Sequence, residues 1–163
     1  MIFSMWDTAT DLLVKAGDVR SVLVGVFIGV RFSVLEALIS IKTAQVSTTW
    51  WNRKKWRRKA LRSVKLVRKW VKRGNVNLVH NLHLLEAELA ILNGHNRLAE
   101  ESYQLAITAA STNGFLQDKA LSHELASLYF GSKGDVCKRD HHMEHAIICY
   151  KEWGARAKVD QLR

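Results

Sequence analysis

Apolar residues at helical spacing predict a series of helices across the second half of the chain. The first helix is marked by leucines three or four positions apart: Leu78, Leu82, Leu85, Leu89 and Leu92. Asn93 and Gly94 then supply the residue types that end a helix in a left-handed cap. A second helix from about Asn96 ends at Asn113 and Gly114, so the two helices form a predicted hairpin.

The same design recurs further along the chain at a fixed offset, which aligns Gly94 with Gly134 and Gly114 with Gly154. One helix carries Leu121, Leu125 and Leu128 and ends near Gly134, and its partner carries Met143, Ala146, Ile147 and Tyr150 and ends at Gly154. A short helix from Ala155 to Leu162 would cover the second hairpin. Repetition at one fixed period is typical of stacked supersecondary units.

The first half of the chain begins with residues 1–20, which are weakly patterned. Residues 21–41 are strongly apolar and contain only Arg31 and Glu36 as charged residues, while Gly25, Gly29 and Ser33 form a stripe of small residues. Such a segment either spans a membrane or is a buried helix that a neighbour approaches closely. A charge near the centre of a spanning helix costs about 2.5–3.5 kcal/mol, and Arg31 favours the buried helix.

A basic amphipathic helix is predicted next. Ala60, Val64, Val67 and Val71 lie on one side of it, and between Arg53 and Arg73 there are 12 Lys or Arg and no acid. This segment accounts for the net charge of +10. The possible basic surface consists of Arg53, Lys54, Lys55, Arg57, Arg58, Lys65, Lys69 and Lys72. One interpretation is that this helix contacts anionic lipid, nucleic-acid phosphate or a calmodulin-like partner. The other is that it is a repeat helix whose charged side chains are only solvated, and this second interpretation is favoured.

Small and large residues alternate where the helices of a hairpin should meet. The predicted packing positions are Ala87, Ala99, Tyr103, Ala106, Gly114, Leu125, Met143, Ala146 and Gly154. This pattern resembles the tetratricopeptide repeat, although the period is 40 rather than about 34 and no proline ends the hairpins. The expected fold is therefore all-α, with antiparallel helix hairpins stacked as a short TPR-like solenoid.

Three regions follow from these patterns. Residues 1–20 are a weakly patterned segment, and residues 21–74 hold the apolar helix and the basic helix as a degenerate first repeat. Residues 75–163 hold two TPR-like hairpins and the short C-terminal helix.

Residues 77–90, 113–126 and 149–159 resemble the helical repeats that follow a STAND-type AAA ATPase module in large multidomain signalling proteins. In that family a Ser/Thr kinase-like domain precedes the ATPase, and a histidine kinase or nucleotide cyclase domain follows the repeats. The resemblance extends from about Trp50 to Arg163. It implies that this chain is the tail of such a repeat region, without the family's kinase, ATPase or cyclase residues.

No catalytic motif is visible: the sequence has neither a P-loop nor a Gly-x-Ser-x-Gly elbow. Cys137, His141, His145 and Cys149 are spaced by four, but on one helix they span three turns, too far for one ion. No metal or cofactor is therefore predicted.

The remaining polar candidates receive no chemical role. We expect His83 and His123 to face solvent or to cap a turn. The acids Glu86, Glu88, Glu100 and Glu101 are expected on helix surfaces.

The sequence thus favours a non-catalytic interaction or scaffold module. Its expected partner is a protein, a peptide or a neighbouring domain of the same polypeptide, and neither nucleic acid nor a small-molecule substrate is expected. Two cysteines and no secretory signal pattern indicate the cytoplasm. The alternative is a membrane-associated protein with residues 21–41 inserted and the basic helix 53–73 on anionic lipid.

Overall fold

Helices account for nearly all of the chain that the structure describes. The computed structural model describes residues 2–17 and 27–163, and no strand occurs among them. The helices are α1 (Ile2–Ala16), α2 (Phe27–Val46), α3 (Trp50–Lys72), α4 (Val79–Leu92), α5 (Asn96–Thr112), α6 (Leu116–Ser132), α7 (Val136–Glu152) and α8 (Arg156–Leu162). A 3₁₀ turn, η2 (Val76–Leu78), leads into α4. The all-α prediction is confirmed for these residues.

The chain forms two compact units. Unit 1 consists of Met1–Leu78 and Glu88–His95, and unit 2 consists of Val79–Ala87 and Asn96–Arg163. Helix α4 is divided between them, because residues 79–87 belong to unit 2 and residues 88–92 to unit 1.

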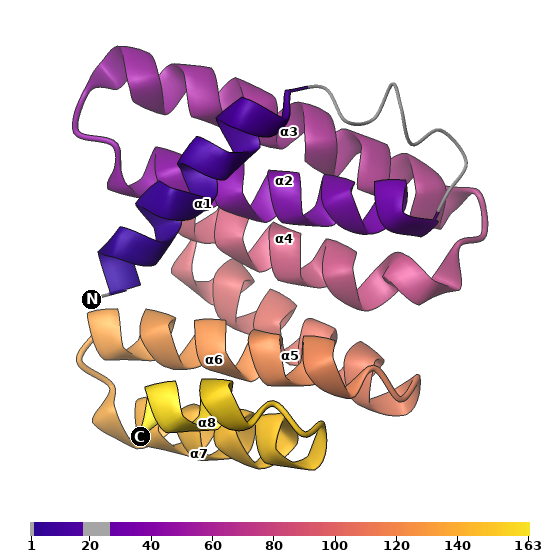
Figure 1. The fold of residues 1–163 in the computed structure, drawn as a ribbon, viewed down its shortest axis with the longest axis vertical. Coiled ribbons are helices and arrows are strands. Elements are labelled where there is room, and N and C mark those ends of the chain that lie inside the picture. Colours follow the sequence, from indigo (N-terminus) through magenta and orange to yellow (C-terminus); the bar gives the residue numbers. More distant parts are fainter. Residues whose placement is uncertain (1, 18–26) are drawn as a thin grey trace. The chain divides into compact units, whose positions relative to one another are not determined.

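Unit 1 is built on the pairing of α2 with α3, and α1 packs on α2 (Figure 1). The hydroxyl groups of Thr10 and Thr43 join α1 to α2 at 2.7 Å. Helix α2 buries apolar residues along its length, and α3 contributes Trp56, Ala60, Val64 and Val67. The predicted apolar side of the basic helix therefore faces the core, with Val71 half-buried.

The small-residue stripe is only partly visible, because Gly25 lies outside the described residues. Gly29 and Ser33 are buried, and the Ser33 hydroxyl donates to the Gly29 carbonyl at 3.0 Å. Within residues 2–17 and 27–163, no helix combines the length and apolarity needed to cross a membrane. Residues 21–26 of the apolar segment are not among those described.

Unit 2 is a run of helices in which each packs on the next: α5 on α6, α6 on α7 and α7 on α8 (Figure 1). Helix α6 is enclosed on several sides, since its buried residues include Ala120, Leu125 and Phe130. At the C-terminal end, Val159 of α8 packs into a cluster with Ala146 and Tyr150 of α7.

Glycines in the left-handed region close the helices from α3 to α7. At Gly134, where φ is +77°, the amide donates to the Gly131 carbonyl at 3.2 Å and the next amide, Asp135, donates to Phe130 at 3.1 Å. This pair of bonds is the Schellman motif, which satisfies carbonyls that a helix end leaves without partners. The same geometry recurs at equal intervals along the chain, at Gly74, Gly94, Gly114, Gly134 and Gly154.

Replacing a capping glycine should cost stability for backbone reasons alone. A Cβ on Gly134 would meet nothing within 4 Å, so Gly134→Ala suffers only from the positive φ, about 1–2 kcal/mol. Gly131, three positions earlier in α6, is the matched control, because alanine is favoured in a helix and the nearest atom, 3.3 Å away, belongs to the flexible Arg139 side chain. Thermal unfolding should show Gly134→Ala melting earlier and Gly131→Ala melting at or above the parent; equal melting of the two variants would contradict this account of the cap.

Candidate functional site

The residues predicted to pack between repeat helices lie mostly in the core. Ala87, Ala99, Ala106 and Ala146 are fully buried. Tyr103 and Leu125 are also buried, Met143 is half-buried, and Gly114 and Gly154 lie in the helix caps. Within unit 2, the Tyr103 ring of α5 lies 5.9 Å from the Tyr129 ring of α6. The two rings therefore lie at the contact between α5 and α6.

Enlarging one of these alanines should destabilise unit 2. Ala106→Trp forces a large ring into a position with no exposed surface, and overpacking commonly costs about 1–3 kcal/mol or more. Thr108→Trp is the control, because Thr108 lies on the same helix and is exposed. We expect Ala106→Trp to lower the melting temperature by several degrees and Thr108→Trp to leave it nearly unchanged. An unchanged value for Ala106→Trp would remove this position from the helix contact.

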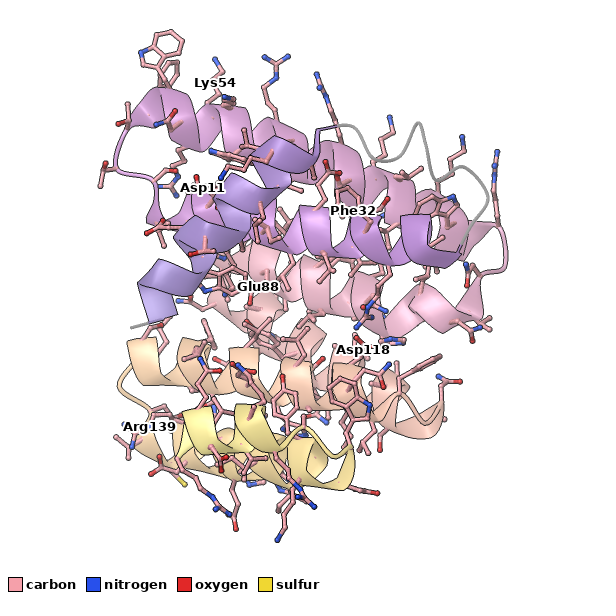
Figure 2. All side chains as sticks on the ribbon, viewed as in Figure 1. Asp11, Phe32, Lys54, Glu88, Asp118 and Arg139 are labelled. Carbon is pink, nitrogen blue, oxygen red and sulfur yellow. The ribbon has the colours of Figure 1, made fainter. Side chains whose placement is uncertain are left out.

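The basic residues of α3 divide into two groups. Arg53 and Arg57 turn toward the end of α4, where Arg53 donates to the Leu92 carbonyl and Arg57 to the Asn93 side chain, each at 3.3 Å. Lys54 points away from the helix (Figure 2), and its ammonium lies 4.7 Å from the centre of the Trp50 ring. Lys55, Arg58, Lys65, Lys69 and Lys72 are all exposed. All eight residues of the predicted basic surface are thus exposed, and two of them, Arg53 and Arg57, also contact the end of α4.

Two carboxylates inside unit 1 hold its helices together. Glu36 of α2 accepts from the Ser63 hydroxyl of α3 at 2.7 Å and lies 3.4 Å from the Lys59 ammonium. Glu88 of α4 pairs with Lys42 at 2.6 Å and accepts from the Gln45 amide at 3.0 Å, both on α2.

The expectation that Glu88 lies on a surface is wrong, since none of its surface is exposed. A buried carboxylate needs such partners, because an unpaired buried charge costs several kcal/mol.

Histidines gather between α6 and α7 in unit 2. His123 is only 6% exposed, so the expectation that it faces solvent is wrong. Its Nδ1 lies 3.0 Å from Nδ1 of His142, and its ring stacks on His145 at 5.2 Å between centres. The ring of His142 stacks in turn on Phe130.

The Cys/His quartet does not converge. His141 and His145 are in contact, with ring centres 4.5 Å apart, but Cys137 is exposed and Cys149 is buried with Tyr150 and Val159. Among the described residues, no group of three or more His, Cys, Asp or Glu is arranged to hold a metal ion.

Burial and neighbouring charges shift the titration of the histidine cluster. Burial, then the charges of His142, His145, Lys119 and His141, lower the pKa of His123 to about 3. Burial lowers the pKa of His142 to about 4, with His141, His145 and Lys138 acting in the same direction. Both imidazoles are therefore neutral at pH 7, as packing in a core requires.

A second polar contact in unit 2 has no counterpart in the predictions. His80 Nε2 of α4 lies 3.2 Å from Asp118 Oδ2 of α6 and 2.7 Å from the Asn81 side chain, while Phe115 stacks on its ring. Figure 2 marks Asp118 on α6. A His and Asp pair can serve as a general base, but both side chains are 3% exposed or less. The pair therefore joins α4 to α6 rather than facing a substrate.

Comparisons with protein-family models, with curated proteins and with solved structures gave no match to this chain.

Acidification should weaken unit 2 through the histidine cluster. Because the folded pKa values of His123 and His142 lie below the unfolded value of 6.5, their stabilisation is complete above pH 6.5 and is lost as pH falls toward 4 and 3. Each group contributes a slope of about 1.4 kcal/mol per pH unit in that range. The melting temperature of His123→Gln should therefore fall less between pH 7 and pH 5 than that of the parent. The exposed His95→Gln is the control, and equal slopes for both variants would contradict the assignment.

Proposed function

We propose that this chain is a non-catalytic helical-repeat module that binds a protein, a peptide or a neighbouring domain of its own polypeptide. The observation that carries the proposal is the recurrence of one helix-and-cap unit at equal intervals from α3 to α7. Repeats of this kind contact mainly their neighbours in sequence, so their outer faces stay open for binding.

We also propose how the hairpins are arranged and to which kind of protein they belong. Alanines and Tyr103 at the helix contacts support a TPR-like solenoid, in which small residues allow close approach and an aromatic residue fills the gap. The sequence resemblance supports assigning the chain to the repeats that follow a STAND-type AAA ATPase module in signalling proteins. We place the module in the cytoplasm, where its two thiols, Cys137 and Cys149, stay reduced.

We place the proposed binding surface on the exposed side of unit 2. Leu98 and Leu105 are two turns apart on α5, so they lie on one face of that helix, and both are about half exposed. Ile148 on α7 is also half exposed. These positions give a probe of binding that does not disturb the core.

Site-specific photo-crosslinking tests the proposal in the cells that make the protein. A photoreactive residue at Leu98, Leu105 or Ile148 should capture a defined protein, or another part of the same polypeptide, reproducibly. The matched control places the same residue at Thr112 or Glu144, which are exposed polar positions on α5 and α7. Absence of any defined product at all three apolar positions would contradict binding through this side.

The purified chain should also hydrolyse no ATP above the buffer background, since the proposal assigns it no catalytic role. A colorimetric phosphate assay checks this. ATP turnover that survives removal of contaminants and rises in proportion to the chain would overturn the proposal.

A further inference from the structure

The outer face of α3 carries a row of cations that the interior of unit 1 does not use. The row consists of Lys54, Arg58, Arg62, Lys65, Lys69 and Lys72, which follow one another at steps of three or four positions. All six are exposed. At about 1.5 Å per residue the row is about 27 Å long. We call these six residues the outer basic row.

The outer basic row is not neutralised by ion pairs with the described carboxylates. The two buried carboxylates among the described residues of unit 1 contact residues outside the row: Glu36 contacts Ser63 and Lys59, and Glu88 contacts Lys42 and Gln45. No described carboxylate forms an ion pair with a member of the row. The row is therefore a strong attractor for anions.

Two tryptophans mark one end of the row. Trp50 and Trp51 are 58% and 70% exposed, with ring centres 4.4 Å apart. A shallow hollow of about 510 Å³ beside them is lined by Trp51, Lys54, Lys55, Arg58, Lys59 and Arg62. A hollow with several cations and an indole at its edge suits a phosphate group that carries an apolar tail.

We propose that the outer basic row docks on the surface of an anionic phospholipid bilayer, with Trp50 and Trp51 at headgroup depth. A flat bilayer can meet a straight row along its whole length, whereas the phosphates of a duplex curve away from it. Tryptophan concentrates at the membrane interface, and clusters of four to eight Lys or Arg bind anionic lipid. The apolar side of α3 is buried in unit 1, so the helix stays folded on the protein and does not enter the acyl region.

The test uses the full chain and sedimentation with vesicles. Vesicles of phosphatidylcholine with 30 mol% phosphatidylserine, in roughly 0.1 M salt, should bind the chain, and pure phosphatidylcholine should not. Binding should weaken steeply with added salt, because exposed charges are screened. Brominated lipid should quench tryptophan fluorescence, and Trp51→Ala should lose part of that quenching.

Charge variants assign the binding to α3. The quadruple change Arg58→Gln, Lys65→Gln, Lys69→Gln and Lys72→Gln should lower the partition coefficient by roughly 100-fold or more, since each cation near the surface contributes about fivefold. The control removes four exposed cations of unit 2: Lys133→Gln, Lys151→Gln, Arg156→Gln and Arg163→Gln. It has the same net charge and should bind within a few-fold of the parent. Circular dichroism checks folding, and Lys65→Gln with Lys69→Gln serves if the quadruple variant unfolds.

Several outcomes would overturn the proposal. One is equal loss of binding in the α3 variant and its unit 2 control, which would indicate net charge alone. Another is equal binding to vesicles with and without phosphatidylserine. A third is tighter binding, at physiological salt, to a short single-stranded oligonucleotide than to the vesicles, with the same loss in the α3 variant; that result would assign the row to nucleic acid, with bases stacked on Trp51.

Discussion

The structure from α3 to α7 depends on one hydrogen bond that is repeated at the C-terminal end of each of these helices. The amide of the residue after each capping glycine donates to the carbonyl five positions earlier, at 2.8 to 3.1 Å, and this requires a left-handed backbone at the glycine. The bond fixes where each helix stops. As a result, α5, α6 and α7 each have 17 residues. Because the repeat length is constant, the same side of each of these helices faces the core.

Charge is the second constraint, and it acts mainly in unit 1. Helix α3 and the residue after it place 12 Lys or Arg close together, and these repel one another. Glu36 and Glu88 offset part of this repulsion from inside, and their contacts with Ser63, Lys59, Lys42 and Gln45 join α2 to α3 and α4. Exposed pairs such as Arg97 with Glu101 add little by comparison, because water and salt screen them. The interior acids therefore matter more for unit 1 than their number suggests.

Sequence patterns predicted the parts of this structure that depend on local rules. Gly94 and Gly134 end helices because the cap requires a positive φ, and Val64 and Val67 are buried because their spacing places them on one side of α3. Glu88 was misplaced because buried residues occur on several sides of α4, and in such a helix polarity no longer alternates with exposure. The need for a polar partner could have been foreseen for Glu36, because this acid lies inside an apolar run and a buried acid requires such a partner.

His123 shows how the choice of period affects a prediction. At the longer period, that of a whole hairpin, it aligns with His83, which is partly exposed. At half that period, that of a single helix and its cap, it aligns with Tyr103, which is buried. The register of the caps therefore places His123 in the core. The contacts of His123 with His142 and His145 were not predictable, because they depend on how α6 and α7 face each other.

The cap at each helix end also bears on how such a chain can change in evolution. The backbone bonds of each cap join the last turn of a helix to the three residues that directly follow it. At the end of α4, side chains from another helix add to these bonds, since Arg53 donates to the Leu92 carbonyl and Arg57 to the Asn93 side chain. A duplication that inserts one whole hairpin after Gly114 would thus recreate the same junction on both sides, and a deletion of one hairpin would leave one junction intact. The chain can therefore become longer or shorter by whole hairpins without a new type of turn. Selection can thus change the number of hairpins independently of the sequence of each one.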